Sequence, residues 1–159
     1  MPNPAEQLAG KTLDGGWRVL KAVSFPSTRT GGVFSKSYMV ESKDGTRAFL
    51  KALDYYEAFK TRDPSVVLQA MTGAFNFERN LLVKCRDRHM DRVVRGITDG
   101  TIRFDDTPSG VVQYLIFELA EGDIRTHLAL AAQVELAWCL RCLHHIATGL
   151  KQLDRKSVV

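Results

Sequence analysis

Two charged side chains occupy positions where the sequence pattern favours apolar residues. Lys51 lies in a run that predicts a strand, and because alternate side chains of a strand share a face, it shares its face with Phe49 and Leu53. Glu78 lies within a helical stripe whose other members, spaced by three and four residues, are apolar: Met71, Phe75, Leu82 and Cys85. Lysine is rarely buried without a partner, so an inward Lys51 predicts an anion close to it.

Each of the two residues also has an ordinary interpretation when it is taken alone. Lys51 is compatible with an edge-strand lysine that reaches to water, and Glu78 is compatible with the solvated edge of the helix stripe. An inward lysine and an inward glutamate would instead satisfy each other, and removing one partner of such a buried pair costs about 3–5 kcal/mol. We therefore expect Lys51 and Glu78 to pair, with Lys51 able to neutralise an anion.

Residues 30–35, with the sequence Thr-Gly-Gly-Val-Phe-Ser, separate two predicted strands. Glycines at such a place, here Gly31 and Gly32, let the backbone approach a phosphate closely and present N–H donors to it. A Gly-Gly pair is also an ordinary turn, and this one is not followed by the Gly-Lys-Ser/Thr of a P-loop. The segment alone is compatible with a phosphate-binding loop of another kind or with a plain turn.

Cysteines and histidines cluster near the end of the chain and invite a metal interpretation. Cys139, Cys142, His144 and His145 lack a second ligand pair at zinc-finger spacing. They lie in a helical pattern whose apolar members are Leu136, Trp138, Leu140, Leu143, Ile146, Leu150 and Leu153. Cysteines in such a helix are usually small core residues, so we predict no metal site here.

The pattern along the chain predicts five strands and three helices. From β-branched and aromatic content and from turn residues, we expect strands at 17–23, 33–40, 47–53, 93–104 and 111–119. Asp44-Gly45 is a hairpin signal. Asp63 and Pro64 predict the N-cap and first residue of a long helix, and further helices are expected at 124–130 and 134–153. The order indicates an α+β fold.

Bulk properties restrict the class of protein. The chain has 159 residues, a formal net charge of +4 and three cysteines, Cys85, Cys139 and Cys142, which argues against a disulfide framework and for a reducing, cytoplasmic setting. Lys and Arg are spread along the sequence without a recognised binding motif, so we expect no nucleic-acid partner. No apolar stretch approaches the roughly 20 residues of a membrane span, so we expect no membrane partner.

Taken in order, these features resemble the N-terminal lobe of protein kinases. Residues 29–40 resemble the glycine-rich loop, with Phe34 at its tip. Residues 47–53 resemble the V-A-I-K strand, which implies that Lys51 pairs with phosphates. Residues 75–82 resemble the core of the first large helix, which implies that Glu78 holds that lysine. The resemblance thus implies catalytic roles for Lys51 and Glu78.

The resemblance continues through residues 114–128, which look like the fifth strand, the hinge and the next helix. It implies that Phe117 is the gatekeeper behind the adenine, that backbone groups of Glu118 and Ala120 contact the adenine edge, and that Asp123 lies near the ribose. The glycine-rich loop departs from the family pattern. Gly32 alone falls on a motif glycine, with Thr30 and Ser35 at the other two positions, so we expect a weaker grip on phosphate.

As a whole, the resemblance implies a kinase-like N-lobe at residues 10–119, a five-stranded antiparallel sheet with one large helix. An N-terminal tail at 1–9 would precede it, and 120–159 would form the hinge and first helices of an incomplete C-lobe. The implied function is the ATP-binding portion of a protein-kinase-like domain, a Ser/Thr-type phosphotransferase with a protein substrate in full-length form. The catalytic base and the Mg²⁺ ligands are expected beyond Val159, so the chain as given is expected to be catalytically incomplete.

The last predicted helix is apolar almost all round its axis, and such helices are normally buried on every side. We therefore expect the missing C-lobe, or a protein partner, to cover it. Two alternatives to an ATP-binding portion stay open. One is a non-catalytic kinase-like regulatory or interaction module. The other is an unrelated α+β binding domain in which Lys51 and Glu78 lie far apart.

Overall fold

The computed structural model describes residues 2–24, 34–120, 122, 124–131 and 133–155. Its strands are β1 (Arg18–Ala22), β2 (Ser35–Glu41), β3 (Arg47–Leu53), β4 (Gly96–Arg103) and β5 (Val111–Glu118). Its α-helices are α1 (Tyr55–Ala58), α2 (Pro64–Asp87), α3 (Ile124–Leu130) and α4 (Leu136–Arg155). Three short 3-10 helices complete the described elements, namely η1 (Pro4–Glu6), η2 (Asp14–Gly16) and η3 (Pro108–Gly110).

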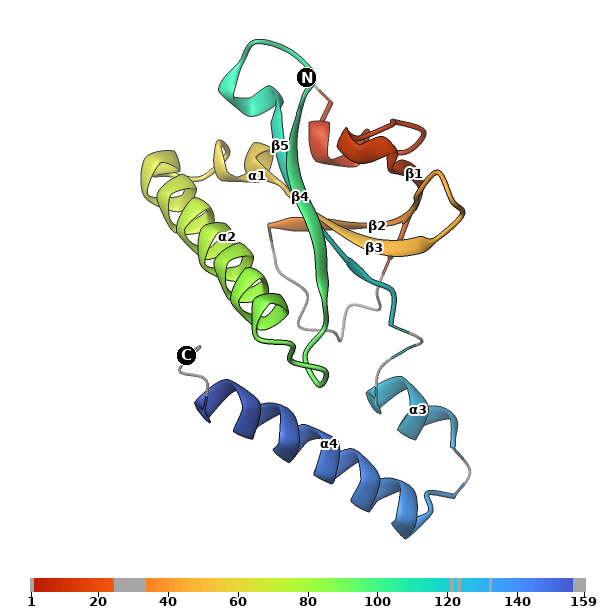
Figure 1. The fold of residues 1–159 in the computed structure, drawn as a ribbon. Coiled ribbons are helices and arrows are strands. Elements are labelled where there is room, and N and C mark those ends of the chain that lie inside the picture. The colour runs from red at the N-terminus through yellow and green to blue at the C-terminus, as the bar shows by residue number, and fades with distance from the viewer. Residues whose placement is uncertain (1, 25–33, 121, 123, 132, 156–159) are drawn as a thin grey trace.

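The five strands form one sheet in the order β1-β2-β3-β5-β4, and every neighbouring pair is antiparallel. Helix α2 lies along one side of this sheet, and α3 and α4 lie together beyond one end of it (Figure 1). The predicted α+β fold, with an antiparallel five-stranded sheet and one large helix, is therefore confirmed. The hairpin signal is confirmed as well, because Gly45 in the turn between β2 and β3 has φ +84°, a value that favours glycine.

Helix α2 begins as its sequence predicts. The Asp63 side chain accepts a hydrogen bond from the Val66 N–H, and Pro64 occupies the first turn, where its missing N–H costs nothing. The buried residues of the helix are the apolar members of the predicted stripe, Met71, Phe75, Leu82 and Cys85. Because Glu78 belongs to the same stripe, the helix directs it toward the sheet.

Both faces of the sheet are covered. On the α2 face, the buried sheet residues that pack with the helix are Leu53, Leu115 and Phe117, and the partly buried Phe49 packs against them. On the opposite face, residues of the N-terminal segment pack against β1, β2, β3 and β5: Ala5, Leu8, Leu13 and Trp17. Residues 1–9, which the resemblance treats as a tail, thus include the buried apolar residues Pro4, Ala5 and Leu8.

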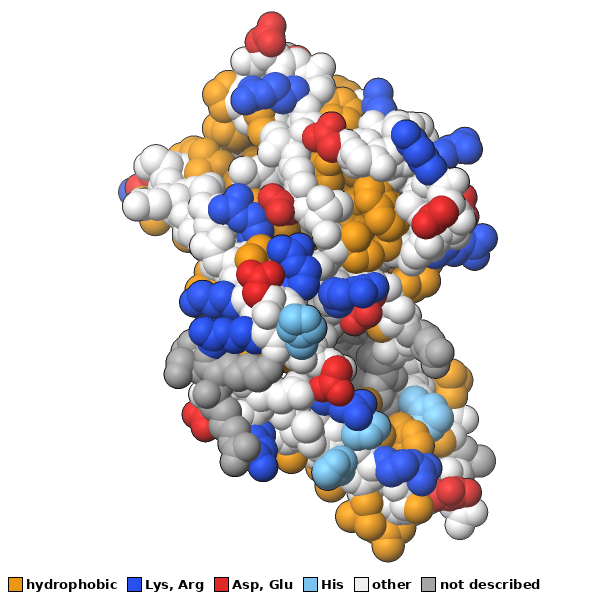
Figure 2. Space-filling model, viewed as in Figure 1, with side chains coloured by type: hydrophobic (Ala, Val, Ile, Leu, Met, Phe, Trp, Pro, Cys, Tyr) orange, Lys and Arg blue, Asp and Glu red, His pale blue; other side chains and the backbone are white. Residues whose placement is uncertain are grey.

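Helix α4 contacts α2 and the segment after it near its own C-terminal end, and its Trp138 stacks on His127 of α3 with ring centroids 4.5 Å apart. Gln152 Nε2 donates a hydrogen bond to Asp91 Oδ1 at 2.7 Å, and Leu153 packs beside Cys85 and Met90. The preceding turns expose their apolar side chains, and Leu136 is 74% accessible. Figure 2 shows apolar side chains on the surface at the end of the molecule where Figure 1 places α4.

The exposed face of α4 bears on the prediction for its two cysteines. Cys139 and Cys142 are only half-buried, so within this chain they do not pack as the core residues that the sequence pattern predicts.

Across the described ranges, no three His, Cys, Asp or Glu residues come together as metal ligands. None of the helices that the structure describes is both long and apolar enough to cross a membrane.

Candidate functional site

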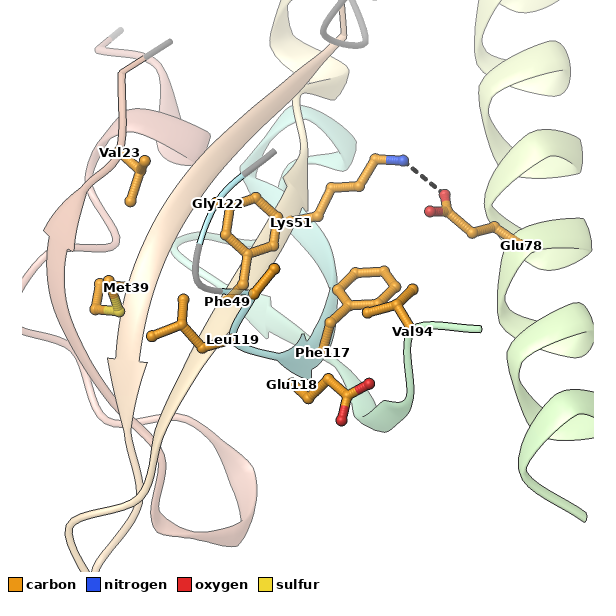
Figure 3. A pocket seen from close by; sticks show the side chains of 11 residues that line it. Val23, Met39, Phe49, Lys51, Glu78, Val94, Phe117, Glu118, Leu119 and Gly122 are labelled. Carbon is orange, nitrogen blue, oxygen red and sulfur yellow. Dashed lines mark hydrogen bonds and ion pairs between the residues drawn. The ribbon is translucent and has the colours of Figure 1, made fainter. Parts of the chain in front are cut away.

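Lys51 and Glu78 form a direct ion pair. Lys51 Nζ donates to Glu78 Oε2 at 2.7 Å, so the predicted pairing of these two oddly placed charges is present (Figure 3). About a third of each side chain is exposed, 30% for Lys51 and 33% for Glu78. Such partial exposure leaves the lysine within reach of a ligand.

The sheet order decides how Lys51 is held. Strand β3 is the middle strand of the five, and Lys51 lies opposite Ser37 of β2 and Leu115 of β5. The interpretation of Lys51 as an edge-strand lysine that reaches to water is therefore wrong. With neighbouring strands on both sides, its backbone position is fixed, and its side chain leaves the sheet on the α2 face toward Glu78.

A pocket of about 490 Å³ opens beside the ion pair. Its lining is mostly apolar and comes from β2, β3 and β5, from α2, and from residues just after β1, just before β4 and just after β5: Val23, Met39, Phe49, Lys51, Glu78, Val94, Phe117, Glu118, Leu119, Ala120 and Gly122. Lys51 and Glu78 lie at one side of this lining and Glu118 lies at the other (Figure 3). The pocket therefore offers an apolar interior between two polar ends.

The apolar interior follows from strand register. Met39 of β2, Phe49 of β3 and Phe117 of β5 are direct cross-strand partners, so their side chains form one row on the face that also carries Lys51. The rings of Phe49 and Phe117 lie 6.4 Å apart between centroids and are tilted by 49°. Two tilted aromatic rings provide surfaces against which a planar ring can pack by stacking or edge contact.

The end of β5, which leads into one wall of the pocket, is hydrogen-bonded to the segment just before β4. The backbone N–H of Glu118 donates to the Arg95 carbonyl oxygen at 3.0 Å, and the Arg95 N–H donates to Glu118 Oε1 at 2.8 Å. These two bonds fix the point at which the chain leaves β5 and enters the pocket wall formed by Leu119 and Ala120. Backbone groups at this wall are thereby placed across the pocket from Lys51.

A second, smaller pocket of about 160 Å³ lies against the same ion pair. Phe34, Ser35, Leu53, Met71, Ala74 and Phe75 line it together with Lys51 and Glu78. Phe34 is anchored there because its carbonyl oxygen accepts a hydrogen bond from the Asp54 N–H at 2.9 Å. The ion pair is thus a shared wall between the two pockets, and the start of β2 adjoins it.

The structure brings most of the predicted site residues to these two pockets. Phe117, Glu118 and Ala120 line the larger one, and Phe34 and Ser35 line the smaller one. The predictions for Gly31, Gly32 and Asp123 fall outside the described residues.

Sequence reasoning missed six residues that line the larger pocket, namely Val23, Met39, Phe49, Val94, Leu119 and Gly122. One signal for Phe49 was present, because it stands two positions before Lys51 on the same strand face. Met39 could be placed only with the register between β2 and β3 in hand. Comparison with known protein families and with curated proteins found no match to this sequence.

Proposed function

We propose that this chain is the ATP-binding portion of a protein-kinase-like domain of the Ser/Thr type. One observation carries the proposal: a single pocket joins an aromatic-walled apolar interior to a lysine held by a glutamate. A nucleotide has the complementary construction, with a flat base at one end and anionic phosphates at the other. The order of strands and helices, which follows the kinase-like resemblance, supports the same interpretation.

Each part of the pocket has a role in this proposal. The base packs against Phe49 and Phe117, and its polar edge meets backbone groups of Glu118 and Ala120. Lys51 neutralises phosphate charge, while Glu78 holds the ammonium group in place before the ligand arrives. Because phosphoryl transfer depends mainly on positioning and charge neutralisation, these residues supply the binding part of that chemistry.

Magnesium normally accompanies ATP, and in such sites it is bound by one or two carboxylates together with the phosphates. The described residues gather no three His, Cys, Asp or Glu side chains that could hold an ion. Glu78 is already engaged by Lys51. The described part of the chain therefore does not fit the role of a metal site, and we assign it no metal-dependent step.

Thermal unfolding in the presence of Mg-ATP tests the proposal. A ligand that binds only the folded state stabilises it by about 2.7 kcal/mol at a concentration of 100 times Kd. We expect Mg-ATP to raise the Tm of the wild type, and we expect Lys51→Ala to lose that increase. Lys60→Ala is the matched control, because Lys60 forms an exposed ion pair with Glu57 away from both pockets. No increase for the wild type, or an equal increase in Lys51→Ala, would refute ATP binding at this site.

The exposed apolar side chains of α3 and α4 favour a second candidate function, a kinase-like interaction module that binds a protein instead of a nucleotide. Leu130 is 82% accessible and Leu136 is 74% accessible, and they belong to a series of exposed apolar residues along these two helices. The same thermal experiment separates the two functions, because a pure interaction module gains no stability from Mg-ATP.

A further inference from the structure

Asp54 is the one charged residue that is buried among the described residues, with 1% of its surface accessible. It directly follows β3, the strand that carries Lys51. Burying a carboxylate is costly unless hydrogen bonds and opposite charge compensate it. The partners of Asp54 therefore show what this buried charge holds together.

Three separate parts of the chain meet at the Asp54 carboxylate. Asn3 Nδ2 donates to Asp54 Oδ2 at 2.8 Å, and the Glu57 N–H, in the first turn of α1, donates to Oδ1 at 3.3 Å. Lys36 Nζ of β2 lies 3.7 Å from Oδ2. A single side chain thus connects the N-terminal segment, α1 and β2 at the end of β3.

The N-terminal segment is fixed at this place by further contacts. Lys36 Nζ also bonds Glu6 Oε1 at 2.6 Å, and the Tyr38 hydroxyl donates to the Ala5 carbonyl oxygen at 2.5 Å. The Asn3 side chain accepts a bond from the Ala5 N–H at 3.0 Å, which starts η1. The segment is therefore held to β2 and β3 through side chains as well as by the burial of Ala5.

From Asp54 the contacts continue to the helix that carries Glu78. The next residue, Tyr55, packs in the cluster with Met71 and Phe75 of α2. Its hydroxyl lies 3.3 Å from Thr72 Oγ1 of the same helix and also bonds Gln113 of β5. A shift of α1 would therefore move contacts that place α2 against the sheet.

We propose that Asp54 is a positioning residue: through its hydrogen bond with Asn3, the N-terminal segment holds β3 and α2 in the positions that close the Lys51–Glu78 ion pair. When Asn3 no longer donates, the buried carboxylate loses a partner, the end of β3 and the start of α1 rearrange around it, and the ion pair opens. The effect on nucleotide affinity rests on the proposed function, whereas the effect on the ion pair does not.

The test measures the state of the ion pair directly. Acylation of each lysine amine, followed by mass spectrometry of the folded protein, reports how available Lys51 is. Glu78→Gln gives the reactivity of Lys51 without its charged partner. A hydrogen bond to a buried charge contributes a free energy equal to about a tenfold change in an equilibrium constant. Losing that bond in Asn3→Ala should therefore raise the reactivity of Lys51 most of the way to its reactivity in Glu78→Gln.

Two further variants separate positioning from loss of stability. Leu8→Ala removes packing from the same segment but no partner of Asp54, so Lys51 reactivity should stay at the wild-type level at temperatures where the protein is folded. The double variant Asn3→Asp with Asp54→Asn exchanges the donor and the acceptor of the bond between positions 3 and 54. It should therefore restore the low reactivity of Lys51. Where Asn3→Ala does not fold, Asn3→Ser, which keeps an acceptor for Ala5 but cannot reach Asp54, replaces it.

The proposal is overturned if Lys51 in folded Asn3→Ala, or in its replacement, reacts as in the wild type. It is also overturned if Leu8→Ala raises Lys51 reactivity as much as Asn3→Ala does, or if the exchanged double variant stays as reactive as Asn3→Ala. Titration with Mg-ATP is run in parallel. A wild type that binds no Mg-ATP contradicts the proposed function, while the lysine reactivities still decide the role of Asp54.

Discussion

The sheet with α2 buries most of its apolar side chains, whereas the helices α3 and α4 leave many of theirs exposed. Leu50 and Ile116 in the sheet are completely buried, whereas Leu136 on α4 is 74% accessible. The sheet has cover on both faces, from α2 and from the N-terminal segment. Helix α4 contacts α2 and the segment after it through Gln152 and Leu153, near its own C-terminal end.

This contrast shows how firmly each end of the candidate pocket is held. Lys51 and Glu78 belong to the packed part, where neighbouring strands and a buried helix stripe determine their positions. Leu119, Ala120 and Gly122 lie on the link between the two parts. The positions of the side chains at the charged end of the pocket are therefore fixed by a well-packed core. The end that would meet the base is formed by a more exposed segment with fewer packing contacts.

The largest expected effect compares one leucine from each part. Leu50→Ala removes a fully buried side chain from the sheet and should lower the free energy of unfolding by about 2–5 kcal/mol. Leu143→Ala removes a side chain that is already exposed, so it should change that free energy by about 0.5 kcal/mol or less. Urea unfolding of both variants measures the difference. Equal losses would mean that α4 is packed as firmly as the sheet.

The second prediction separates ligand binding from stability within the packed part. Glu78→Gln keeps a hydrogen-bonding group but removes the charge that holds Lys51, so Mg-ATP affinity should fall by about tenfold. The ion pair is a third exposed, so the unfolding free energy should fall by about 1 kcal/mol or less. Glu57→Gln is the control, because its exposed pair with Lys60 lies outside both pockets. If both variants weaken binding alike, Glu78 has no special role.

A third prediction concerns the exposed face of α4. Replacing Leu140 and Leu143 together by Glu should reduce the binding of an apolar fluorescent dye and any self-association, because both side chains lie open. The same change should leave the unfolding free energy of the sheet within about 0.5 kcal/mol of the wild type. Dye titration and analytical ultracentrifugation measure these effects. Unchanged dye binding would show that the exposed leucines form no accessible surface.

The smallest expected effect is a pH dependence of the hairpin between β2 and β3. The Asp44 carboxylate accepts hydrogen bonds from the Ser42 hydroxyl, which has the larger effect, and from the Thr46 N–H. These bonds lower the pKa of Asp44 to about 2. A pKa lower in the folded state means that the stabilisation is present above the unfolded pKa of about 3.9 and is lost as the pH falls toward 2. Asp44→Asn should therefore be less stable than the wild type at pH 6, and this difference should shrink at pH 2. A difference independent of pH would contradict the lowered pKa.

Much of the fold was predictable because its signals are local. Strand alternation gives β3 at the predicted residues, and the Asp63–Pro64 start gives α2. The pairing of Lys51 with Glu78 was also predictable, because each is a charge in an apolar pattern.

Other features depend on contacts that no local pattern reveals. The bond between Asn3 and Asp54 joins residues 51 positions apart, and neither residue interrupts a periodic stripe. The part played by Met39 in the pocket follows from sheet register, which the sequence specifies only through the assembled core. Helix α1 has four residues, too few for a helical period to show.

The most direct test of the central claim is an NMR titration of the backbone amides with Mg-ATP. Binding in the larger pocket should shift the signals of Lys51, Phe117 and Ala120 together, and Lys51→Ala should abolish these shifts at the same concentration. Shifts confined to other parts of the molecule, or shifts that persist unchanged in Lys51→Ala, would contradict nucleotide binding at the Lys51–Glu78 pocket.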